Sequence, residues 1–596
     1  MKFHKNIFFL IKELIYIINI SLYLAMFFAQ KPGLINKPKN ITAMMKENLT
    51  QFIISSIKKN WEITSMTDYK GESLTFKDVG TRIAKLHYLF DALGIKKGDK
   101  IALLGKNSSN WGVTFLGTIT YGAVIVPILP DFKPNDVHHI TNHSDSVLLF
   151  AADNLFENLE MSEMKNLLGA FSLSDFSLLA SGKAKNGKKL AAQAEKAFNQ
   201  KHPEGLRPED VNYTPVPNSE LAEISYTSGT TGFTKGVMIH HNSLTANVVY
   251  ANNNMPLDPG DKIVSFLPLA HTYGCAFEFL WPFTLGCHIT FLTKTPSPQI
   301  ILDAFKNIRP RLVLSVPLVI EKIYKKQLLP VISKPSMKVL LNTPVVNHVI
   351  KKKIREKLSM AFGGNFHEVV IGGAALNKDV EIFFNKIGFP FSIGYGMTEC
   401  GPLISYANWD KTRLGSAGKL VDTLQVKIDS PDPYKEVGEI MVRGENVMLG
   451  YFKNEEATKA ALDKDGWLHT GDLGVIDKDN FIYIKGRSKS MILGPSGQNI
   501  YPEEIENKYN NMPYVMEALV AEKNGQLVVL IYPDFEAVHK DGISEAKLNE
   551  IMEGHRKQLN HELPNYMSVA KFNIVPEEFE KTPKRSIKRF LYTIEE

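Results

Sequence analysis

The chain has 596 residues, too many for one hydrophobic core, and this length predicts two or more domains. Its 44% apolar and 22% charged residues are typical of a globular protein, and a net charge of +6 without a dense basic stripe argues against nucleic acid as a partner. Cys275, Cys287 and Cys400 are widely spaced and lack metal-ligand spacing, which excludes a disulfide framework and predicts a reducing, cytoplasmic setting without structural zinc.

Residues 1–44 form an apolar extension that differs from the rest of the chain. Its longest apolar stretch, Leu14–Ala29, is interrupted by polar residues and is shorter than the roughly 20 residues that a membrane-spanning helix needs. No clear small-x-small cleavage site follows it. Two hypotheses remain open: the extension attaches the protein to a membrane surface, or it is a start-site artefact and translation begins at Met44 or Met45.

Strand and helix patterns alternate from residue 73 onwards. Short apolar runs predict strands at 73–76, 100–104, 121–127 and 147–151, and a helical period predicts a helix over 79–93. Repeated strand–helix units predict parallel sheets covered by helices. Further along, Asn242 is placed to cap a helix that continues to residue 254.

Residues 225–238 combine glycines, Ser and Thr hydroxyls and Lys235 between two apolar runs. Glycines let the backbone approach an anion, hydroxyls and N–H groups donate to its oxygens, and a lysine adds a compact positive charge. The spacing matches neither a Walker A loop nor a GxGxxG dinucleotide fingerprint. The stretch predicts a phosphate-binding loop, and a polar hairpin turn is the alternative interpretation.

A second change in pattern, near residues 483–490, separates a final block of about 105 residues, which is within the usual size of a domain. This block has predicted strands at 518–521 and 527–531 and predicted helices at 503–510 and 546–561. We therefore predict a large domain over 45–486 and a small α+β domain over 487–596.

Six further motifs follow the phosphate-binding stretch in order. They are Pro268–Gly274, Gly372–Leu376, Gly394–Glu399, Thr470–Asp472, Gly486–Lys489 and Gly497–Glu506. Together the motifs resemble those of the adenylate-forming superfamily of acyl-CoA synthetases, peptide adenylation domains and luciferases, from about Phe76 to Leu591. The resemblance implies an α/β fold, in which a large N-terminal α/β domain of stacked sheets and helices precedes a small mobile C-terminal α+β domain with its hinge at Lys489.

In this superfamily a carboxylate attacks the α-phosphate of ATP, giving an acyl-adenylate and pyrophosphate, and a thiol then displaces AMP. The resemblance implies ATP, Mg²⁺ and CoA as cofactors, with Thr227 and Glu399 as Mg²⁺ ligands. The implied catalytic residues are Thr227, Lys235, His271, Thr398, Glu399 and Lys588. The implied cofactor-binding residues are Thr227, Ser228, Gly229, Thr230, Thr231, Gly232, Lys235, Gly373, Ala374, Tyr395, Gly396, Thr398, Asp472, Arg487, Lys489 and Gly497.

The resemblance also assigns individual roles. Tyr395 stacks on adenine, Asp472 and Arg487 hold the ribose, His271 lines the carboxylate site, and Gly497 faces the pantetheine channel. An isolated histidine is more often structural, so the role of His271 depends on the matched motifs around it.

Two positions depart from the family pattern. Thr234 stands where the phosphate loop usually has proline, and Ser586 stands where the family has the lysine that reaches both the carboxylate and the α-phosphate. In an extended segment, Lys584 and Lys588 share the face of Ser586. We hypothesise that one of these two lysines substitutes, with Lys588 preferred.

Residues 307–317, 321–324 and 351–362 resemble the long-chain fatty acyl-CoA synthetase branch, which implies a fatty acid and CoA as partners. The aromatic stretch at 277–281 lines an acyl tunnel or belongs to the core; both interpretations stay open. The leading hypothesis is ATP-dependent activation of a long-chain fatty acid to acyl-CoA. Its alternatives are transfer to an acyl carrier protein and, given Ser586, a non-adenylating protein that binds acyl-AMP or acyl-CoA.

Overall fold

The computed structural model describes residues 44–228, 234–294, 297–343, 346–493, 498–523, 525–582 and 587–592. The predictions made for most of the apolar extension and for Gly229–Gly232, Gly497, Lys584 and Ser586 therefore lie outside the described residues. Among the helices that are described, none is both long and apolar enough to cross a lipid bilayer.

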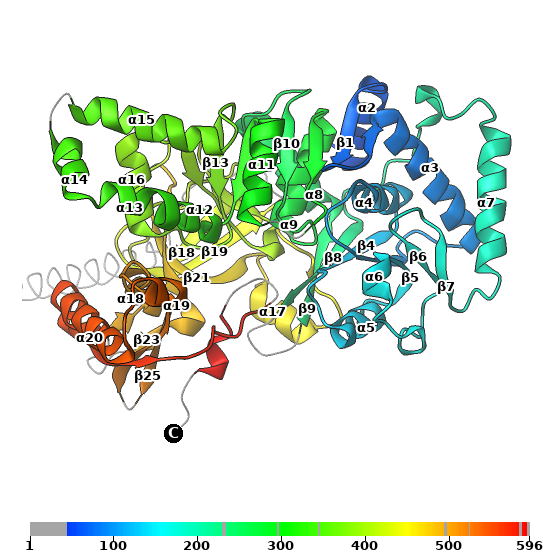
Figure 1. The fold of residues 1–596 in the computed structure, drawn as a ribbon. Helices are drawn as coiled ribbons and strands as arrows, with labels where there is room; N and C mark the ends of the chain where they lie inside the picture. Colours follow the sequence, from blue (N-terminus) through cyan, green and yellow to red (C-terminus); the bar gives the residue numbers. More distant parts are fainter. Residues whose placement is uncertain are drawn as a thin grey trace, which may run out of the picture.

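An eight-stranded sheet occupies the right and centre of Figure 1, with the strand order β20-β9-β8-β4-β3-β5-β6-β7. Its strands are β3 (Lys100–Leu104), β4 (Val124–Ile128), β5 (Ser146–Ala151), β6 (Gly169–Ser172), β7 (Leu178–Ser181), β8 (Leu221–Ser228), β9 (Thr234–His240) and β20 (Gly450–Tyr451). β3 to β6 pair in parallel, and β3 and β4 are almost continuous buried runs, as expected for parallel strands covered on both faces. The accompanying helices are α3 (Phe76–Leu93), α4 (Ser109–Tyr121), α5 (Pro134–His143), α6 (Asp153–Phe156) and α7 (Gly187–Lys201).

A seven-stranded sheet lies beside the first, with the order β14-β13-β12-β10-β11-β1-β2. Its strands are β1 (Thr64–Asp68), β2 (Ser73–Thr75), β10 (Lys262–Ser265), β11 (His288–Phe291), β12 (Leu312–Ser315), β13 (Glu368–Ile371) and β14 (Phe391–Ile393). The helices of this region are α2 (Leu49–Lys59), α8 (His241–Asn254), α9 (Thr272–Gly274), α10 (Trp281–Leu285), α11 (Pro298–Ile308), α12 (Pro317–Ile323), α13 (Leu329–Ile332), α14 (Pro335–Asn342), α15 (Val346–Ala361) and α16 (Lys378–Ile387), with π-helical turns η3 (Cys275–Leu280) and η4 (Tyr324–Leu328).

Two antiparallel sheets follow in the chain. The first contains β18 (Leu424–Asp429), β19 (Gly438–Gly444), β21 (Leu468–Ile476) and β22 (Ile482–Arg487); the second contains β15 (Tyr395–Gly396), β16 (Leu403–Tyr406) and β17 (Lys419–Leu420). The short turn η5 (Thr398–Cys400) and helix α17 (Glu455–Ala461) lie between these strands in sequence. Buried and partly exposed residues alternate along β21, so Thr470 and Asp472 both face the packed side of the sheet.

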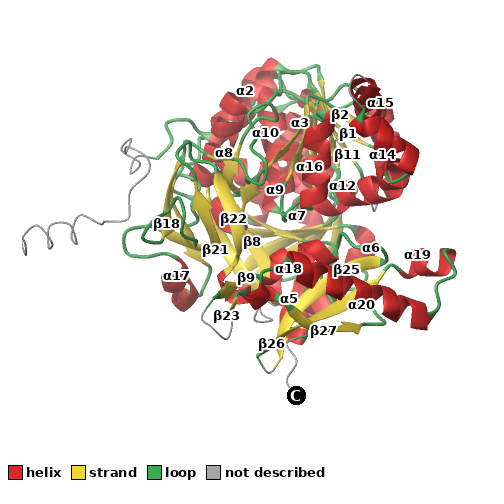
Figure 2. Ribbon diagram, turned by 90° about the vertical axis from the view of Figure 1, so that its left-hand side faces the viewer, coloured by secondary structure: helices red, strands yellow, loops and turns green. Residues whose placement is uncertain are grey.

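The last part of the chain has a hydrophobic core of its own, formed by residues such as Tyr509, Val529 and Met552. Its elements, at the lower right of Figure 2, are β23 (Ile492–Leu493), β24 (Asn499–Ile500), α18 (Pro502–Tyr509), β25 (Val515–Lys523), β26 (Gln526–Pro533), α19 (Phe535–Lys540), α20 (Glu545–Glu562) and β27 (Val569–Ile574). β25, β26, α18 and α20 correspond to the two strands and two helices that the sequence predicts for a small α+β unit, whereas β23, β24, α19 and β27 were not predicted. The domain boundary at 486/487 and the hinge movement stay predictions.

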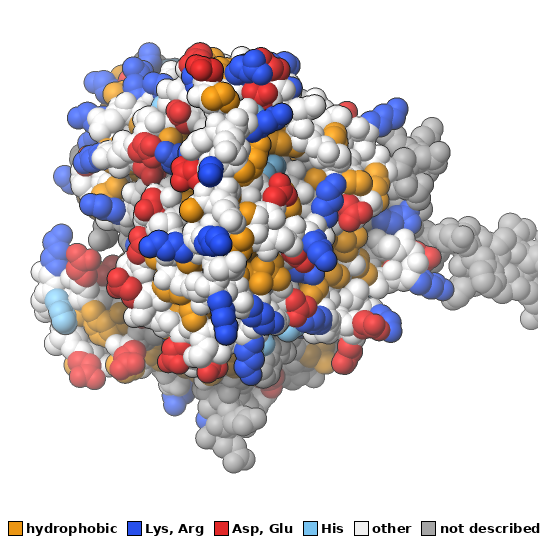
Figure 3. Space-filling model, turned by 90° about the vertical axis from the view of Figure 1, so that its right-hand side faces the viewer, with side chains coloured by type: hydrophobic (Ala, Val, Ile, Leu, Met, Phe, Trp, Pro, Cys, Tyr) orange, Lys and Arg blue, Asp and Glu red, His pale blue; other side chains and the backbone are white. Residues whose placement is uncertain are grey.

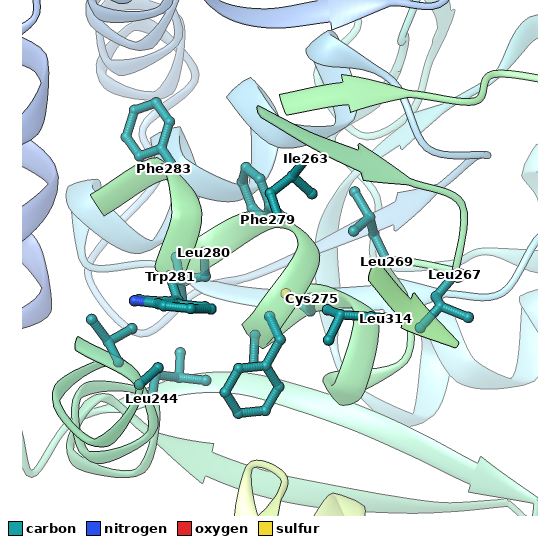
Figure 4. Packing of buried hydrophobic residues seen from close by; sticks show 14 of the residues in the cluster. Leu244, Ile263, Leu267, Leu269, Cys275, Phe279, Leu280, Trp281, Phe283 and Leu314 are labelled. Carbon is teal, nitrogen blue, oxygen red and sulfur yellow. The ribbon is translucent and has the colours of Figure 1, made fainter. Parts of the chain in front are cut away.

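Side chains from several elements meet in the main core around η3 and α10 (Figure 4). Phe279 is fully buried, with its ring centroid 6.0 Å from that of Trp111 and 5.7 Å from that of Phe115. Trp281 is also fully buried, and its Nε1 donates to Asn252 Oδ1 at 2.9 Å. These contacts favour the core interpretation of the aromatic stretch at 277–281 over the tunnel interpretation.

Two local predictions were wrong. Asn242 does not cap α8: the N-cap is His240, while the Asn242 side chain accepts from Met45 N and donates to Glu445 Oε2, both at 2.8 Å. The strand predicted over 121–127 begins only at Val124, because Tyr121 is the last residue of α4, which ends on a glycine in the left-handed conformation.

Candidate active site

The predicted phosphate-binding stretch forms the antiparallel pair β8–β9. Thr227 lies opposite Lys235, and its Oγ1 donates to the Lys235 carbonyl oxygen at 3.5 Å; Ser228 ends β8. Gly236 packs tightly against β8, because a Cβ there would lie 2.8 Å from Ile224 Cγ2. The strand register therefore places Thr227 and Lys235 side by side where the loop leaves the sheet.

Tyr451, on β20, connects Lys235 to Glu399. Lys235 Nζ lies 4.9 Å from the centroid of the Tyr451 ring, and the Tyr451 hydroxyl donates to Glu399 Oε1 at 2.8 Å. Burial, reinforced by the Glu399 charge, raises the pKa of Tyr451, which keeps its hydroxyl protonated as a donor. No sequence pattern indicates Tyr451, since it stands 52 positions from Glu399 and belongs to no phosphate-binding motif.

A second cluster centres on Asp472. Its Oδ2 accepts from the Tyr395 hydroxyl at 2.7 Å and its Oδ1 lies 2.9 Å from Arg487 Nε. The carboxylate is buried and Arg487 is mostly exposed. Burial raises the pKa of Asp472, whereas Arg487 and the Tyr395 hydrogen bond act in the opposite direction. The structure thus brings together three residues that the sequence assigns to the nucleoside.

The residues next to Asp472 hold its strand in place. Thr470 Oγ1 donates to the Ile440 carbonyl oxygen at 2.7 Å and accepts from Asp472 N at 3.1 Å. Gly471 N donates to Glu439 Oε1 at 2.9 Å. The Thr-Gly-Asp motif therefore joins β21 to β19 by side-chain hydrogen bonds, which fixes the Asp472 backbone.

His271 lies half-buried at the N-terminal end of α9. The segment before it is held by Asn107, which is buried: Asn107 Nδ2 donates to the Leu267 carbonyl oxygen at 2.7 Å, and Asn107 Oδ1 accepts from Leu269 N at 3.0 Å. These hydrogen bonds join positions about 160 residues apart in the chain, so no local sequence pattern indicates them.

Glu278 holds the same segment from the other side. It is fully buried on η3, and its Oε2 accepts from the backbone N–H groups of Phe266 and Leu267, both at 3.0 Å. Burial raises the pKa of Glu278 well above its ordinary value, although these two hydrogen bonds oppose the shift. Asn107 and Glu278 together fix the backbone that leads into His271.

The glycine-rich loop after β13 is exposed at Gly373 and Ala374, and Gly373 has a φ of +89°, a conformation that favours glycine. Gly396 also lacks room for a side chain, because a Cβ would lie 2.3 Å from the Pro402 carbonyl oxygen. Thr398 is buried in η5 beside Glu399. Small residues thus leave backbone accessible at positions that the sequence assigns to adenine.

The predicted hinge and the substitute lysine lie outside these two clusters. Lys489 is exposed in the short turn after β22. Lys588 forms an ion pair with Glu580, and the neighbouring Arg589 Nη1 donates to the buried Glu506 at 2.8 Å. These contacts hold residues 588 and 589 against the rest of the C-terminal unit.

Glu399 is the carboxylate that the sequence assigns to Mg²⁺. Among the described residues, no three His, Cys, Asp or Glu side chains gather closely enough to form a protein-only metal site. One carboxylate fits Mg²⁺, which commonly takes its other ligands from phosphate oxygens and water, and Thr227 as a second protein ligand stays a prediction.

Comparison with known proteins identifies the family. The model of the AMP-binding enzyme family matches residues 55–452. The chain is 31% identical over 458 residues to the long-chain-fatty-acid–CoA ligase of Salmonella typhimurium, covering 73% of this chain and 76% of that protein. It is 27% identical over 537 residues to the long-chain-fatty-acid–CoA ligase ACSBG2 of Gallus gallus, covering 83% of this chain and 67% of that protein.

Solved structures share the fold. ATP-bound MatB from Rhodopseudomonas palustris superposes with a TM-score of 0.70 at 21% identity, over 92% of this chain and 98% of that chain. The O-succinylbenzoate CoA synthetase MenE of Bacillus subtilis, in complex with ATP and magnesium ion, gives a TM-score of 0.69 at 21% identity, over 90% of this chain and 98% of that chain. By the extent of the family match and the identity to its relatives, the chain belongs to the AMP-binding enzyme family.

Proposed function

We propose that the protein is an ATP-dependent long-chain fatty acid–CoA ligase that works through an acyl-adenylate. The observation that carries the proposal is that a chain of this family contains two clusters: Lys235–Tyr451–Glu399 and Tyr395–Asp472–Arg487. The first supplies a cation and a carboxylate beside a glycine-rich loop, as a triphosphate with Mg²⁺ requires. The second supplies a buried carboxylate for the two ribose hydroxyls.

In the first half-reaction, an oxygen of the fatty acid carboxylate attacks the α-phosphorus, and the bond to the pyrophosphate oxygen breaks. Lys235 would neutralise charge on the leaving phosphates, Thr227 would help to orient them, and Thr398 would donate to the α-phosphate. Glu399 would hold Mg²⁺, which offsets the negative charge of the phosphates when it is bound. His271 would line the site of the carboxylate.

In the second half-reaction, the CoA sulfur bonds the acyl carbon and its thiol proton passes to water. The bond between the acyl carbon and the phosphate oxygen breaks, and AMP departs. The small domain would rotate about Lys489 between the two half-reactions, and Gly497 would then face the pantetheine channel. CoA is the proposed acceptor because both sequence relatives described above, from Salmonella typhimurium and Gallus gallus, are CoA ligases.

The long-chain preference is supported by the same relatives, whose names specify long-chain fatty acids. Each methylene buried from water contributes about 0.8 kcal/mol, so an apolar acyl site discriminates by chain length. Transfer to an acyl carrier protein is the second candidate function. Non-adenylating binding of acyl-AMP or acyl-CoA is the third, motivated by Ser586 at the position of the usual lysine.

One assay distinguishes these functions. AMP and pyrophosphate release are measured with acetate, octanoate and palmitate, each without a thiol, with CoA, and with a pantetheinylated acyl carrier protein. We expect sustained AMP release with palmitate and CoA. Turnover with the carrier protein alone would support the second function, and nucleotide binding without AMP formation with any acid would support the third and refute the proposal.

The substitute lysine gives a separate prediction. We expect that Lys588→Ala or Lys584→Ala lowers pyrophosphate release by about 100-fold or more, the scale on which loss of one transition-state charge acts. Thioester formation from preformed palmitoyl-AMP and CoA is expected to continue in the same variant. Lys571→Ala, which removes an exposed lysine from β27, is the matched control. Full pyrophosphate release in both test variants would show that neither lysine replaces the usual one.

A further inference from the structure

Residues 317–361, which contain α12 to α15, have a strongly positive net charge. They include ten Lys and Arg residues and two Glu, a net charge of +8, whereas the entire chain has a net charge of +6. Five of these lysines, all among the described residues, are exposed: Lys322, Lys334, Lys352, Lys353 and Lys357. Outside this segment the chain therefore has a slight excess of acidic residues.

The two glutamates of the segment neutralise little of this charge. Glu321 is half-buried and accepts from Asn377 N at 3.0 Å, and the lysine with which its charge interacts is Lys325, which is not one of the five exposed lysines. Glu356 pairs with Lys352 at 3.9 Å, an exposed contact of the kind that contributes little.

The same segment exposes aliphatic side chains. Of the twenty large hydrophobic residues that are exposed among the described residues, seven lie in this short stretch. They are Leu318, Leu329, Val331, Val339, Val346, Val349 and Met360. Val339 and Met360 are 65% and 67% exposed, which makes them two of the three most exposed residues of that set.

The helices that carry these residues form one end of the molecule. α13, α14 and α15 lie together at the upper left of Figure 1, away from the eight-stranded sheet, and α14 and α15 are at the upper right of Figure 2. The opposite face, shown in Figure 3, is the one on which α7 lies in Figure 1, and there basic and acidic side chains are interspersed. Basic charge and exposed aliphatic side chains therefore coincide on the α12–α15 end.

We propose that the α12–α15 end is a docking surface for an anionic lipid bilayer. Lysines near such a bilayer gain about a factor of five in binding each from the negative surface potential, and short aliphatic side chains enter the headgroup boundary without needing matching pockets. An acidic protein would satisfy the lysines, but it would need its own complementary apolar sites for aliphatic side chains scattered over four helices. Charge and apolar exposure together thus fit lipid better than protein.

The first test measures co-sedimentation of the full chain with vesicles. Phosphatidylcholine vesicles are compared with vesicles that contain phosphatidylglycerol, at low and at physiological salt. We expect preferential binding to the anionic vesicles, weakened by salt. The triple variant Lys352→Gln, Lys353→Gln, Lys357→Gln is expected to bind anionic vesicles about 100-fold more weakly, because three such lysines are removed. The charge-matched control is Lys188→Gln, Lys189→Gln, Lys196→Gln on α7, where all three lysines are exposed, with little expected loss.

Several results would overturn the proposal. One is equal weakening by both triple variants, which would indicate a response to overall charge. Another is salt-insensitive binding to both vesicle types that the α15 variant retains, which would assign attachment to residues 1–43. A third is absence of vesicle binding together with α15-dependent retention on polyglutamate beads, which would identify an acidic protein partner.

A second measurement locates the contact. The three native cysteines are all buried, so a cysteine introduced by Val339→Cys can be labelled selectively with an environment-sensitive fluorophore in the folded protein. We expect a blue shift of its emission on anionic vesicles and none for the label at Gln193→Cys, an exposed position on α7. Absence of a shift at residue 339 in vesicle-bound protein would contradict docking through this end.

Discussion

Replacing Asp472 by Asn is expected to raise the KM for ATP by at least about 100-fold, because hydrogen bonds to a charged group are worth about 1.5–3 kcal/mol each and two ribose hydroxyls are involved. The carboxylate offers acceptor oxygens on both sides, with Tyr395 on Oδ2 and Arg487 on Oδ1. Asn replaces one of these carboxylate oxygens by an NH₂ group, which is a donor and would face the donor group of Tyr395 or Arg487. The measurement is AMP formation against ATP concentration at saturating palmitate and CoA.

The matched control for this variant is Asp477→Asn. Asp477 also pairs with an arginine, Arg413, at 2.5 Å, but it lies in the turn after β21 and outside the two clusters of the candidate site. Asn retains the acceptor oxygen that receives the N–H groups of Asp479 and Phe481. An unchanged KM for ATP in Asp472→Asn, or an equal rise in Asp477→Asn, would contradict the assignment of Asp472 to the ribose.

The fold was predictable where local pattern decides it. β3 spans the residues that the apolar run predicts, and α3 has its predicted extent with an added first turn, where Thr75 and Asp78 form a capping box. The order of strands in the two large sheets was not predictable, since β1 pairs with β11 more than 200 positions away. The error at Asn242 has the same origin, because its side chain forms hydrogen bonds with the distant residues Met45 and Glu445 and not with the first turn of α8.

The candidate site likewise contains residues that sequence motifs indicated and residues that no motif indicated. Lys235, Glu399 and Asp472 were found because motifs resemble those of a known family, and the structure places each in a cluster with a partner. Tyr451 and Asn107 were missed, since an isolated tyrosine or asparagine has no pattern that indicates a contact in another part of the chain. The assigned roles of all these residues in binding and catalysis stay predictions.

Glu278 was missed for a further physical reason. It lies on a π-helical turn, η3, whose wider winding changes which side chains share a face. A helical period of 3.6 residues therefore does not indicate that its carboxylate is directed at Phe266 and Leu267. A charged residue within an aromatic run is the one signal that the sequence offered.

Glu278→Ala is expected to destabilise the protein by about 2–6 kcal/mol, since each of two buried N–H groups left without an acceptor costs about 1–3 kcal/mol. Glu278→Gln retains an acceptor oxygen and is expected to be much milder. We also expect Glu278→Ala to lower kcat/KM for palmitate at temperatures where it is folded, because the released segment leads into His271. Chemical denaturation and initial rates are the two measurements.

Glu381→Ala is the control that separates positioning from loss of stability. Glu381 is also buried and accepts a backbone N–H, that of Gly415 at 2.6 Å, but it lies on α16 and does not contact the His271 segment. Both alanine variants are expected to be destabilised, and only Glu278→Ala is expected to change kcat/KM for palmitate. Equal kinetic losses would mean that Glu278 acts on activity through stability alone.

The pH dependence of stability tests the protonation state of Glu278 itself. Burial raises its pKa well above the ordinary value of 4.5, so the folded protein retains a proton that the unfolded chain releases as the pH rises above 4.5. The free energy of unfolding therefore loses a contribution from Glu278 with rising pH, whereas below pH 4.5 both states hold the proton and the contribution is constant. Glu278→Gln has no proton to release, so the difference in unfolding free energy between this variant and the wild type should move in favour of the variant from pH 5 to pH 8. A difference that is constant over this range would show that the folded protein does not hold the proton, and the hydrogen bonds from Phe266 and Leu267 would then be bonds to a carboxylate anion.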